Sequence, residues 1–261
     1  MTKPPGMLLP LVATLLCGAV LAQAAKPADH SITSATPAVQ ASSQGRLTIP
    51  VARPQPASAP VPRKRQQTGA TVVSVPDDWN LTAHGKVLYL TFDDGPQLEW
   101  TPKVLQVLAK HNAKATFFVL GQEVAAHPEL LTLERAAGHH IGNHTWDHPM
   151  LTRLPAAKMR QEIFSGVKSK CFRPPFRDTN AAVEATAASY HQRQVLWDVD
   201  TKDWSKPGTA QILRAILGGA RPGAIILMHD GGGNRSETVA ALDQALTQLT
   251  RQGYVYRSLP C

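Results

Sequence analysis

Two adjacent carboxylates, Asp93 and Asp94, follow the apolar run 87–92 and precede Gly95 and Pro96. Neighbouring carboxylates repel each other unless a cation or a basic group lies close by. One of them can ligate a metal ion while the other acts as a base on a water molecule. The alternative is a plain turn, because Asp-Gly-Pro is favourable turn chemistry. The pair is therefore a candidate for metal-assisted hydrolysis that needs partners elsewhere in the chain.

His144 and His148 are candidates for those partners, four residues apart after a later apolar run. Imidazoles at this spacing can lie on one side of a helical turn, as in many zinc sites. Pro149 places the pair in a loop or at a helix start, and with ten histidines in the chain the spacing could arise by chance. Together with one of the two carboxylates, the pair supplies three nitrogen and oxygen ligands and leaves coordination positions open, which is typical of a catalytic metal site. Such donors suit zinc and also accept cobalt, nickel or manganese.

Two other titratable side chains lie at the ends of later apolar runs. Arg173, before Pro174 and Pro175, could hold a carboxylate in place, or it could be a surface arginine beside a rigid turn. His229 ends another run and suits a general acid if a carboxylate orients it, although it could equally be structural. So many titratable groups at run ends are hard to explain by stability alone.

The elements that must position these residues alternate along the chain. Seven apolar runs predict strands: 87–92, 115–120, 140–143, 171–173, 194–199, 224–228 and 254–259. Six helical patterns separate them: 102–111, 128–137, 156–164, 181–190, 210–220 and 237–251, the last with Ser236 as its cap. This alternation predicts an α/β fold with mainly parallel strands, a distorted (β/α)7-type barrel. In such folds, polar side chains at the carboxyl ends of the strands share one face.

The basic charge of the chain is concentrated before this domain. The formal net charge is +8, of which residues 1–72 carry +6, and all aromatic residues lie after residue 72. A segment without aromatics that is rich in Ala, Pro and Ser does not form a core, so residues 25–72 are predicted to be a disordered linker and 73–261 the catalytic domain. That domain lacks a basic stripe, which argues against a nucleic-acid partner.

The first 24 residues have the pattern of a signal peptide. Lys3 precedes an apolar stretch, and Ala22-Gln23-Ala24 has the small residues of a cleavage site; an uncleaved membrane anchor is the alternative. We therefore expect a secreted or periplasmic protein with no stable membrane span after cleavage, and a monomer. Removal of the leader leaves Cys171 and Cys261, which an oxidising compartment permits to form one disulfide. Two free buried thiols are the alternative.

Five stretches, in order, resemble the motifs of NodB-homology polysaccharide deacetylases, which form carbohydrate esterase family 4. They are residues 91–95, 144–148, 173–176, 200–204 and 227–229, and the match spans about residues 85–261. The resemblance implies a distorted barrel with a divalent metal, usually zinc, and a role for each site residue. The metal ligands would be Asp94, His144 and His148. Asp93 would be the general base and His229 the general acid.

The resemblance implies supporting roles as well. Arg173 would orient Asp93, and Asp203 would tune His229. The backbone N–H of Phe176 would stabilise the oxyanion, and the substrate pocket would be lined by Pro174, Trp204 and Leu227. Phe176 itself departs from the tyrosine common at this position, which removes a hydroxyl and keeps the backbone donor. Arg177 stands where the family often has glycine and adds charge beside the cleft.

The function expected on this basis is removal of N-acetyl groups from a polymer containing N-acetylglucosamine, either peptidoglycan or a chitin-type chain. No Gly-x-Ser-x-Gly stretch supplies a serine nucleophile, so activated water is the natural attacker. One alternative is an O-acetyl esterase acting on acetylated xylan-type glycans. The other is a glycan-binding domain without catalysis. In each case the partner is an acetylated glycan.

Overall fold

The computed structural model describes residues 79–261. The predicted signal peptide 1–24, the predicted linker 25–72 and the predicted start of the domain at residue 73 lie outside these residues. Within the described part of the chain, none of the helices combines the length and the apolar character needed to span a bilayer.

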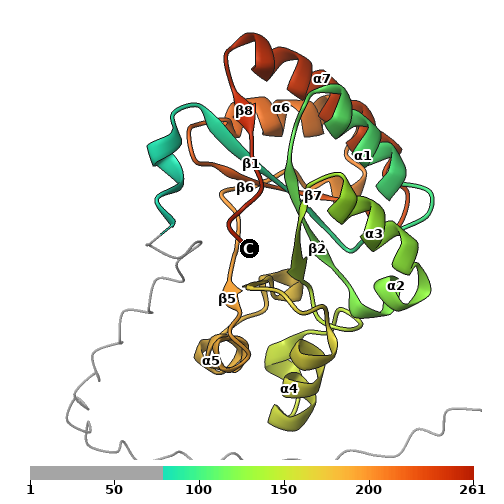
Figure 1. Cartoon of the computed structure of the whole chain (residues 1–261), viewed down its shortest axis with the longest axis vertical. Helices are drawn as coiled ribbons and strands as arrows, with labels where there is room; N and C mark the ends of the chain where they lie inside the picture. Colours follow the sequence, from blue (N-terminus) through green and yellow to red (C-terminus); the bar gives the residue numbers. More distant parts are fainter. Residues whose placement is uncertain (1–78) are drawn as a thin grey trace, which may run out of the picture. The chain divides into compact units, whose positions relative to one another are not determined.

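A parallel sheet curves around the centre of the molecule and carries its helices outside (Figure 1). The strands, in chain order, are β1 (Val87–Asp93), β2 (Ala115–Val119), β3 (His140–Asn143), β4 (Cys171–Phe172), β5 (Arg193–Gln194), β6 (Val199–Asp200), β7 (Ile225–His229) and β8 (Val255–Tyr256). Their order is β5-β4-β3-β2-β1-β7-β6, with β8 paired to β1, and all pairs are parallel. The predicted α/β architecture is therefore confirmed.

The single strand predicted over 194–199 is wrong in detail. β5 pairs with β4 and β6 pairs with β7, so this segment crosses from one edge of the sheet to the other. Between them, the carbonyls of Val195 and Leu196 accept hydrogen bonds from the guanidinium of Arg173, at 3.1 Å each. A buried side chain thus takes the place of a neighbouring strand at this point, and the ladder is interrupted because its acceptors are already used.

All six predicted helices are present, with ends shifted by at most two residues. They are α1 (Thr101–Lys110), α3 (Pro128–Ala136), α4 (Ala156–Ser165), α5 (Ala181–Ser189), α6 (Thr209–Gly219) and α7 (Ser236–Arg251). A further short helix, α2 (Gly121–Ala126), was not predicted because its six residues carry no helical apolar period. The prediction of Ser236 as a cap is also wrong. Ser236 is the first residue of α7, and its N–H donates to the side chain of Asn234 at 2.9 Å.

Strand β1 lies at the centre of the hydrophobic core. Every residue of β1 is buried, as expected for a strand covered on both faces of a parallel sheet. Helices α1 and α7 pack apolar side chains such as Leu108, Leu242 and Leu246 against it. A disulfide joins Cys171, at the start of β4, to Cys261, 90 residues further on. The disulfide therefore links the segment that follows β8 to β4.

Candidate active site

The candidate site lies where the strands end. Parallel strands bring their carboxyl ends to the same edge, so loops that are distant in sequence meet there. Asp93 and His229 are register partners on the adjacent strands β1 and β7. His144 directly follows β3, and its N–H donates to the carbonyl of Val119 at the end of β2. These residues line a cleft of about 460 Å³.

Asp94, His144 and His148 form a three-residue cluster in this cleft. One candidate ligand atom from each lies within 4.8 Å of the others. The Nε2 atoms of His144 and His148 are 3.5 and 3.3 Å from Oδ1 of Asp94. That oxygen is buried and has no hydrogen-bond donor among the described residues. A buried, unsatisfied carboxylate oxygen facing two imidazole nitrogens fits a divalent cation, because these donors are ordinary ligands of zinc and its neighbours.

The orientation of His144 also suits a metal ligand. Its Nδ1 lies 2.7 Å from the carbonyl oxygen of Arg173. A carbonyl only accepts, so Nδ1 carries the proton and Nε2 presents its lone pair to the cluster. Asp94 and His148 have φ angles of 72° and 68°, in the left-handed region that side chains other than glycine seldom adopt. Such conformations persist where the surroundings enforce them, which is common at functional sites.

The charges of the cluster match metal binding. Burial raises the pKa of Asp94, but the neighbouring imidazoles, His144 foremost, outweigh burial and hold this pKa below its usual range. Burial, together with the charge of His144, lowers the pKa of His148. Asp94 is therefore ionised and His148 neutral near pH 7, which are the forms that ligate metals.

The carboxylate of Asp93 is held by the guanidinium of Arg173. Nη1 of Arg173 donates to Oδ1 of Asp93 at 2.7 Å and to Oγ1 of Thr91 at 2.8 Å. Arg173 is completely buried, so its interpretation as a surface arginine is wrong. Oδ2 of Asp93 lies 3.7 Å from Nε2 of His144. One carboxylate oxygen is thus fixed by the guanidinium, and the other faces the cluster.

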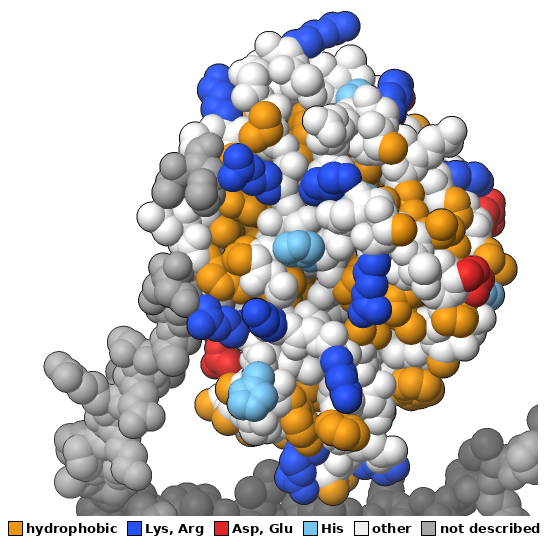
Figure 2. Space-filling model, in the orientation of Figure 1, with side chains coloured by type: hydrophobic (Ala, Val, Ile, Leu, Met, Phe, Trp, Pro, Cys, Tyr) orange, Lys and Arg blue, Asp and Glu red, His pale blue; other side chains and the backbone are white. Residues whose placement is uncertain are grey.

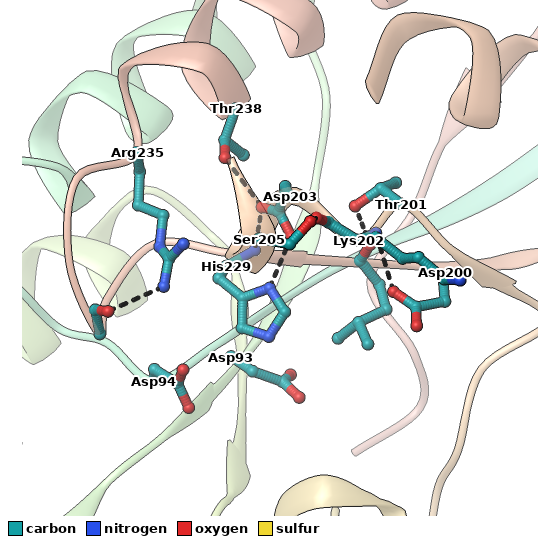
Figure 3. Close-up of polar contacts among 12 residues, drawn as sticks. Asp93, Asp94, Asp200, Thr201, Lys202, Asp203, Ser205, His229, Arg235 and Thr238 are labelled. Carbon is teal, nitrogen blue, oxygen red and sulfur yellow. Dashed lines mark hydrogen bonds and ion pairs between the residues drawn. The ribbon is translucent and has the colours of Figure 1, made fainter. Parts of the chain in front are cut away.

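His229 forms a buried pair with Asp203, which begins the 3-10 helix Asp203–Ser205 (Figure 3). Nδ1 of His229 is 2.7 Å from Oδ1 of Asp203. The other oxygen of Asp203 accepts from the His229 N–H at 2.9 Å and from Thr238 at 2.8 Å. Burial lowers the pKa of His229, but Asp203, through its hydrogen bond and charge, and then Asp93 and Asp94 raise it to about 9. The imidazole is therefore protonated at neutral pH and can donate a proton from Nε2.

The four predicted substrate residues all line the cleft, at different depths: Pro174, Phe176, Trp204 and Leu227. Leu227 is buried, whereas the Phe176 and Trp204 side chains are more than half exposed at the rim. The Phe176 ring packs edge-on against His148, with centroids 4.4 Å apart. Its φ of 58° turns the backbone at this position. Exposed aromatic faces above a polar floor suit the apolar face of a sugar ring.

Sequence reasoning missed several residues of the cleft. Trp197, Gly232 and Arg235 also line it, as does Asp200, which opens the stretch 200–204 but was given no role of its own. Trp197 lies in the segment between β5 and β6. The strand predicted there did not indicate that the Trp197 side chain faces the cleft. The run Gly231-Gly232-Gly233 after His229 was the available signal for the loop that includes Arg235, because consecutive glycines often mark a close backbone approach.

Comparison with known proteins places this chain in a family. Residues 80–195 match the family model described as polysaccharide deacetylase. A peptidoglycan-N-acetylglucosamine deacetylase of Bacillus cereus is 39% identical over 186 residues, which cover 67% of this chain and 87% of that protein. A chitooligosaccharide deacetylase of a Bradyrhizobium species is 39% identical over 194 residues, 66% of this chain and 89% of that protein.

A solved structure agrees with the sequence relatives. The crystal structure of the Bc1960 peptidoglycan N-acetylglucosamine deacetylase superimposes with a TM-score of 0.65 and 35% identity, over 70% of this chain and 88% of that one. The chain belongs to the polysaccharide deacetylase family, and the resemblance in the sequence is confirmed. The distorted barrel is the fold of this family.

Proposed function

We propose that the protein hydrolyses N-acetyl groups of a glycan that contains N-acetylglucosamine, with a divalent metal held by Asp94, His144 and His148. The observation that carries the proposal is the juxtaposition of this cluster with Asp93 on one side and His229 on the other, in one cleft. The named activities of the relatives from Bacillus cereus and Bradyrhizobium support the same reaction.

Zinc is our first choice for the metal, and cobalt, nickel or manganese are the alternatives. The metal would acidify a water molecule and polarise the acetyl carbonyl. The chain supplies the remaining chemistry. Asp93 accepts the proton of the attacking water at Oδ2, while Arg173 holds Oδ1 and keeps the carboxylate in one orientation. Because Arg173 is buried, this orientation is fixed before the substrate arrives.

His229 donates the proton that the leaving nitrogen requires. An amine leaves far more readily when it is protonated, so hydrolysis of an amide needs an acid beside the base. Asp203 accepts from Nδ1 of His229 and keeps Nε2 as the proton donor. The backbone N–H of Phe176 stabilises the charge that develops on the acetyl oxygen. Leu227 and Trp204 enclose the acetyl methyl, and Pro174 with the Phe176 ring borders the sugar.

Acetate release tests this proposal directly. The substrates are a chitooligosaccharide, peptidoglycan and acetylated xylan, each with the enzyme before chelation, after chelation and after zinc is returned. We expect acetate from at least one of the two N-acetylglucosamine substrates, lost with chelator and restored by zinc. Turnover of acetylxylan alone would establish the O-acetyl esterase alternative instead. Metal binding without acetate from any substrate would favour the non-catalytic glycan-binding domain.

The location of the protein is a proposal of the same kind. The peptidoglycan deacetylase relatives bear names that refer to a cell-wall polymer. We propose that residues 1–24 direct export and are then removed, and that residues 25–72 form a linker at the start of the exported protein, before its catalytic domain. Detection of the mature chain in the periplasm or medium, with an N-terminus near residue 25, tests this proposal. Retention of full-length protein in the cytoplasm would contradict it.

A further inference from the structure

The loop after β7, residues 230–235, packs on the turn that carries Asp94. The N–H of Asp230 donates to the carbonyl of Asp93 at 3.2 Å. A side chain at Gly231 would collide with the carbonyl oxygen of Asp94. A Cβ at Gly232 would lie 2.8 Å from Oδ2 of Asp94 itself. The glycine backbone is therefore in direct contact with both the main chain and the carboxylate of Asp94.

Arg235 holds this glycine backbone through two hydrogen bonds. Its Nε donates to the carbonyl of Gly231 at 2.6 Å, and its Nη2 donates to the carbonyl of Gly232 at 3.0 Å. One planar guanidinium thus holds two consecutive carbonyls, which fixes the rotation of the peptide between them. Figure 3 shows Arg235 at the turn before α7, on the same side of the site as Asp94.

The surroundings of Arg235 argue against an ordinary ion pair. The residue is only 3% exposed, and Nη1 is buried with no hydrogen-bond partner in the described part of the chain. No described carboxylate forms a salt bridge with it. A buried cation that forms no salt bridge is costly to stability, so an arginine at position 235 calls for a reason other than stability. Its two bonds to the carbonyls that border Asp94 supply that reason.

We propose that Arg235 is a positioning residue of the metal site. It holds Gly231 and Gly232 against Asp94, so that Asp94 keeps its left-handed backbone and presents Oδ1 to His144 and His148. The inference rests on the proposed metal-dependent function and adds to it a support for the ligand carboxylate. Outer residues of this kind change metal affinity by about 10- to 100-fold when they are altered.

Two glycine substitutions test the contact with a matched control. Gly232→Ala places a methyl 2.8 Å from Oδ2 of Asp94 and 3.2 Å from Nη2 of Arg235, whereas at Gly233 a Cβ would meet no heavy atom within 4 Å. Both positions have positive φ, 69° and 132°, so both substitutions strain the backbone. We expect Gly232→Ala to weaken zinc binding at least about 10-fold. Gly233→Ala should leave zinc affinity within about 2-fold of wild type, although it strains the loop more.

Arg235→Lys supplies an independent test that adds no bulk beside Asp94. Lysine keeps the charge but does not hold two carbonyls in a fixed plane, so zinc affinity should again fall about 10- to 100-fold. Arg214→Gln, on the exposed face of α6, is the control and should change nothing. Zinc affinity is measured by competition with a chromophoric chelator, and the melting temperature of each metal-free variant reports its fold.

The outcomes separate the two proposals. Zinc affinity equal to wild type in folded Gly232→Ala and Arg235→Lys would overturn the role of Arg235 and leave the proposed function intact. A wild-type protein that binds no divalent metal would overturn the proposed function, and this inference with it. If Gly232→Ala does not fold, folded Arg235→Lys decides, and loss of zinc affinity there supports the proposal.

Discussion

At the scale of single residues, the site depends on two pairs, Asp93 with Arg173 and His229 with Asp203, whose partners the resemblance implied and whose contacts the structure shows. Asp93, His144 and His229 stand out because they end apolar runs, and the resemblance to the deacetylases supplied their order. The buried state of Arg173 did not follow from its position before two prolines. Only the structure shows that its guanidinium enters the barrel and reaches both Asp93 and the link between β5 and β6.

The protonation of His229 gives a prediction about pH. Its pKa is raised to about 9, with Asp203 as the largest raising influence. The acid is therefore present below this pH and is lost as pH rises through it, so kcat/KM should fall on the alkaline side. Asp203→Asn removes the charge that raises this pKa, and the alkaline limb should move to lower pH. The pH profile of acetate release from a chitooligosaccharide checks this.

Thr238→Val serves as the comparison for that profile. It removes one hydrogen bond to Asp203 and keeps the carboxylate, so its alkaline limb should move less than that of Asp203→Asn. An Asp203→Asn enzyme with an unchanged alkaline limb would mean that another group is the acid.

At the scale of elements, strand β1 and the segment 193–200 explain what the sequence could and could not predict. β1 was recognised because five of the six residues before Asp93 are aliphatic or aromatic, and its burial pattern agrees. Residues 194–199 were predicted as one strand because four of the six, Val195, Leu196, Trp197 and Val199, are apolar. Its division follows from the Arg173 guanidinium, a tertiary contact that local sequence does not encode.

The same elements yield a stability prediction for Arg173. Arg173→Met removes two donors to the β5–β6 link and leaves the Asp93 carboxylate buried without its partner. Breaking a buried pair in this way costs about 3–5 kcal/mol of unfolding free energy. Urea denaturation of the metal-free protein measures the loss. The double variant Arg173→Met with Asp93→Asn should recover part of it, since the unpaired charge is then gone.

The disulfide gives a second prediction at this scale. Cys171 and Cys261 close a loop with a sequence separation of 90, and neither is among the residues that line the cleft. Replacing both by alanine should lower the unfolding free energy by about 2–5 kcal/mol, chiefly through the unfolded chain. The kcat for acetate release should remain within about 2-fold at a temperature where both proteins are folded. A large loss of kcat with unchanged stability would contradict this account.

At the scale of the whole molecule, net charge distinguishes residues 1–72 from residues 73–261. The face in Figure 2 carries scattered Lys and Arg side chains between neutral and apolar ones, with few acids. Residues 73–261 nevertheless sum to only +2 of the total +8. The fragment 73–261 should therefore deacetylate a neutral chitooligosaccharide with a kcat/KM within about 2-fold of the full chain. A much lower value for the folded fragment would show that residues 1–72 contribute to catalysis.

The most direct measurement of the central claim compares Asp93→Asn with His144→Ala for zinc content and acetate release in the same preparations. Asp93→Asn should keep zinc near wild-type content and lose about 10²- to 10⁴-fold in kcat, because a general base contributes a factor of this size. His144→Ala should lose zinc and activity together, because it removes a ligand. An Asp93→Asn enzyme that turns over at near wild-type rates would contradict the account, because water would then be activated without this base.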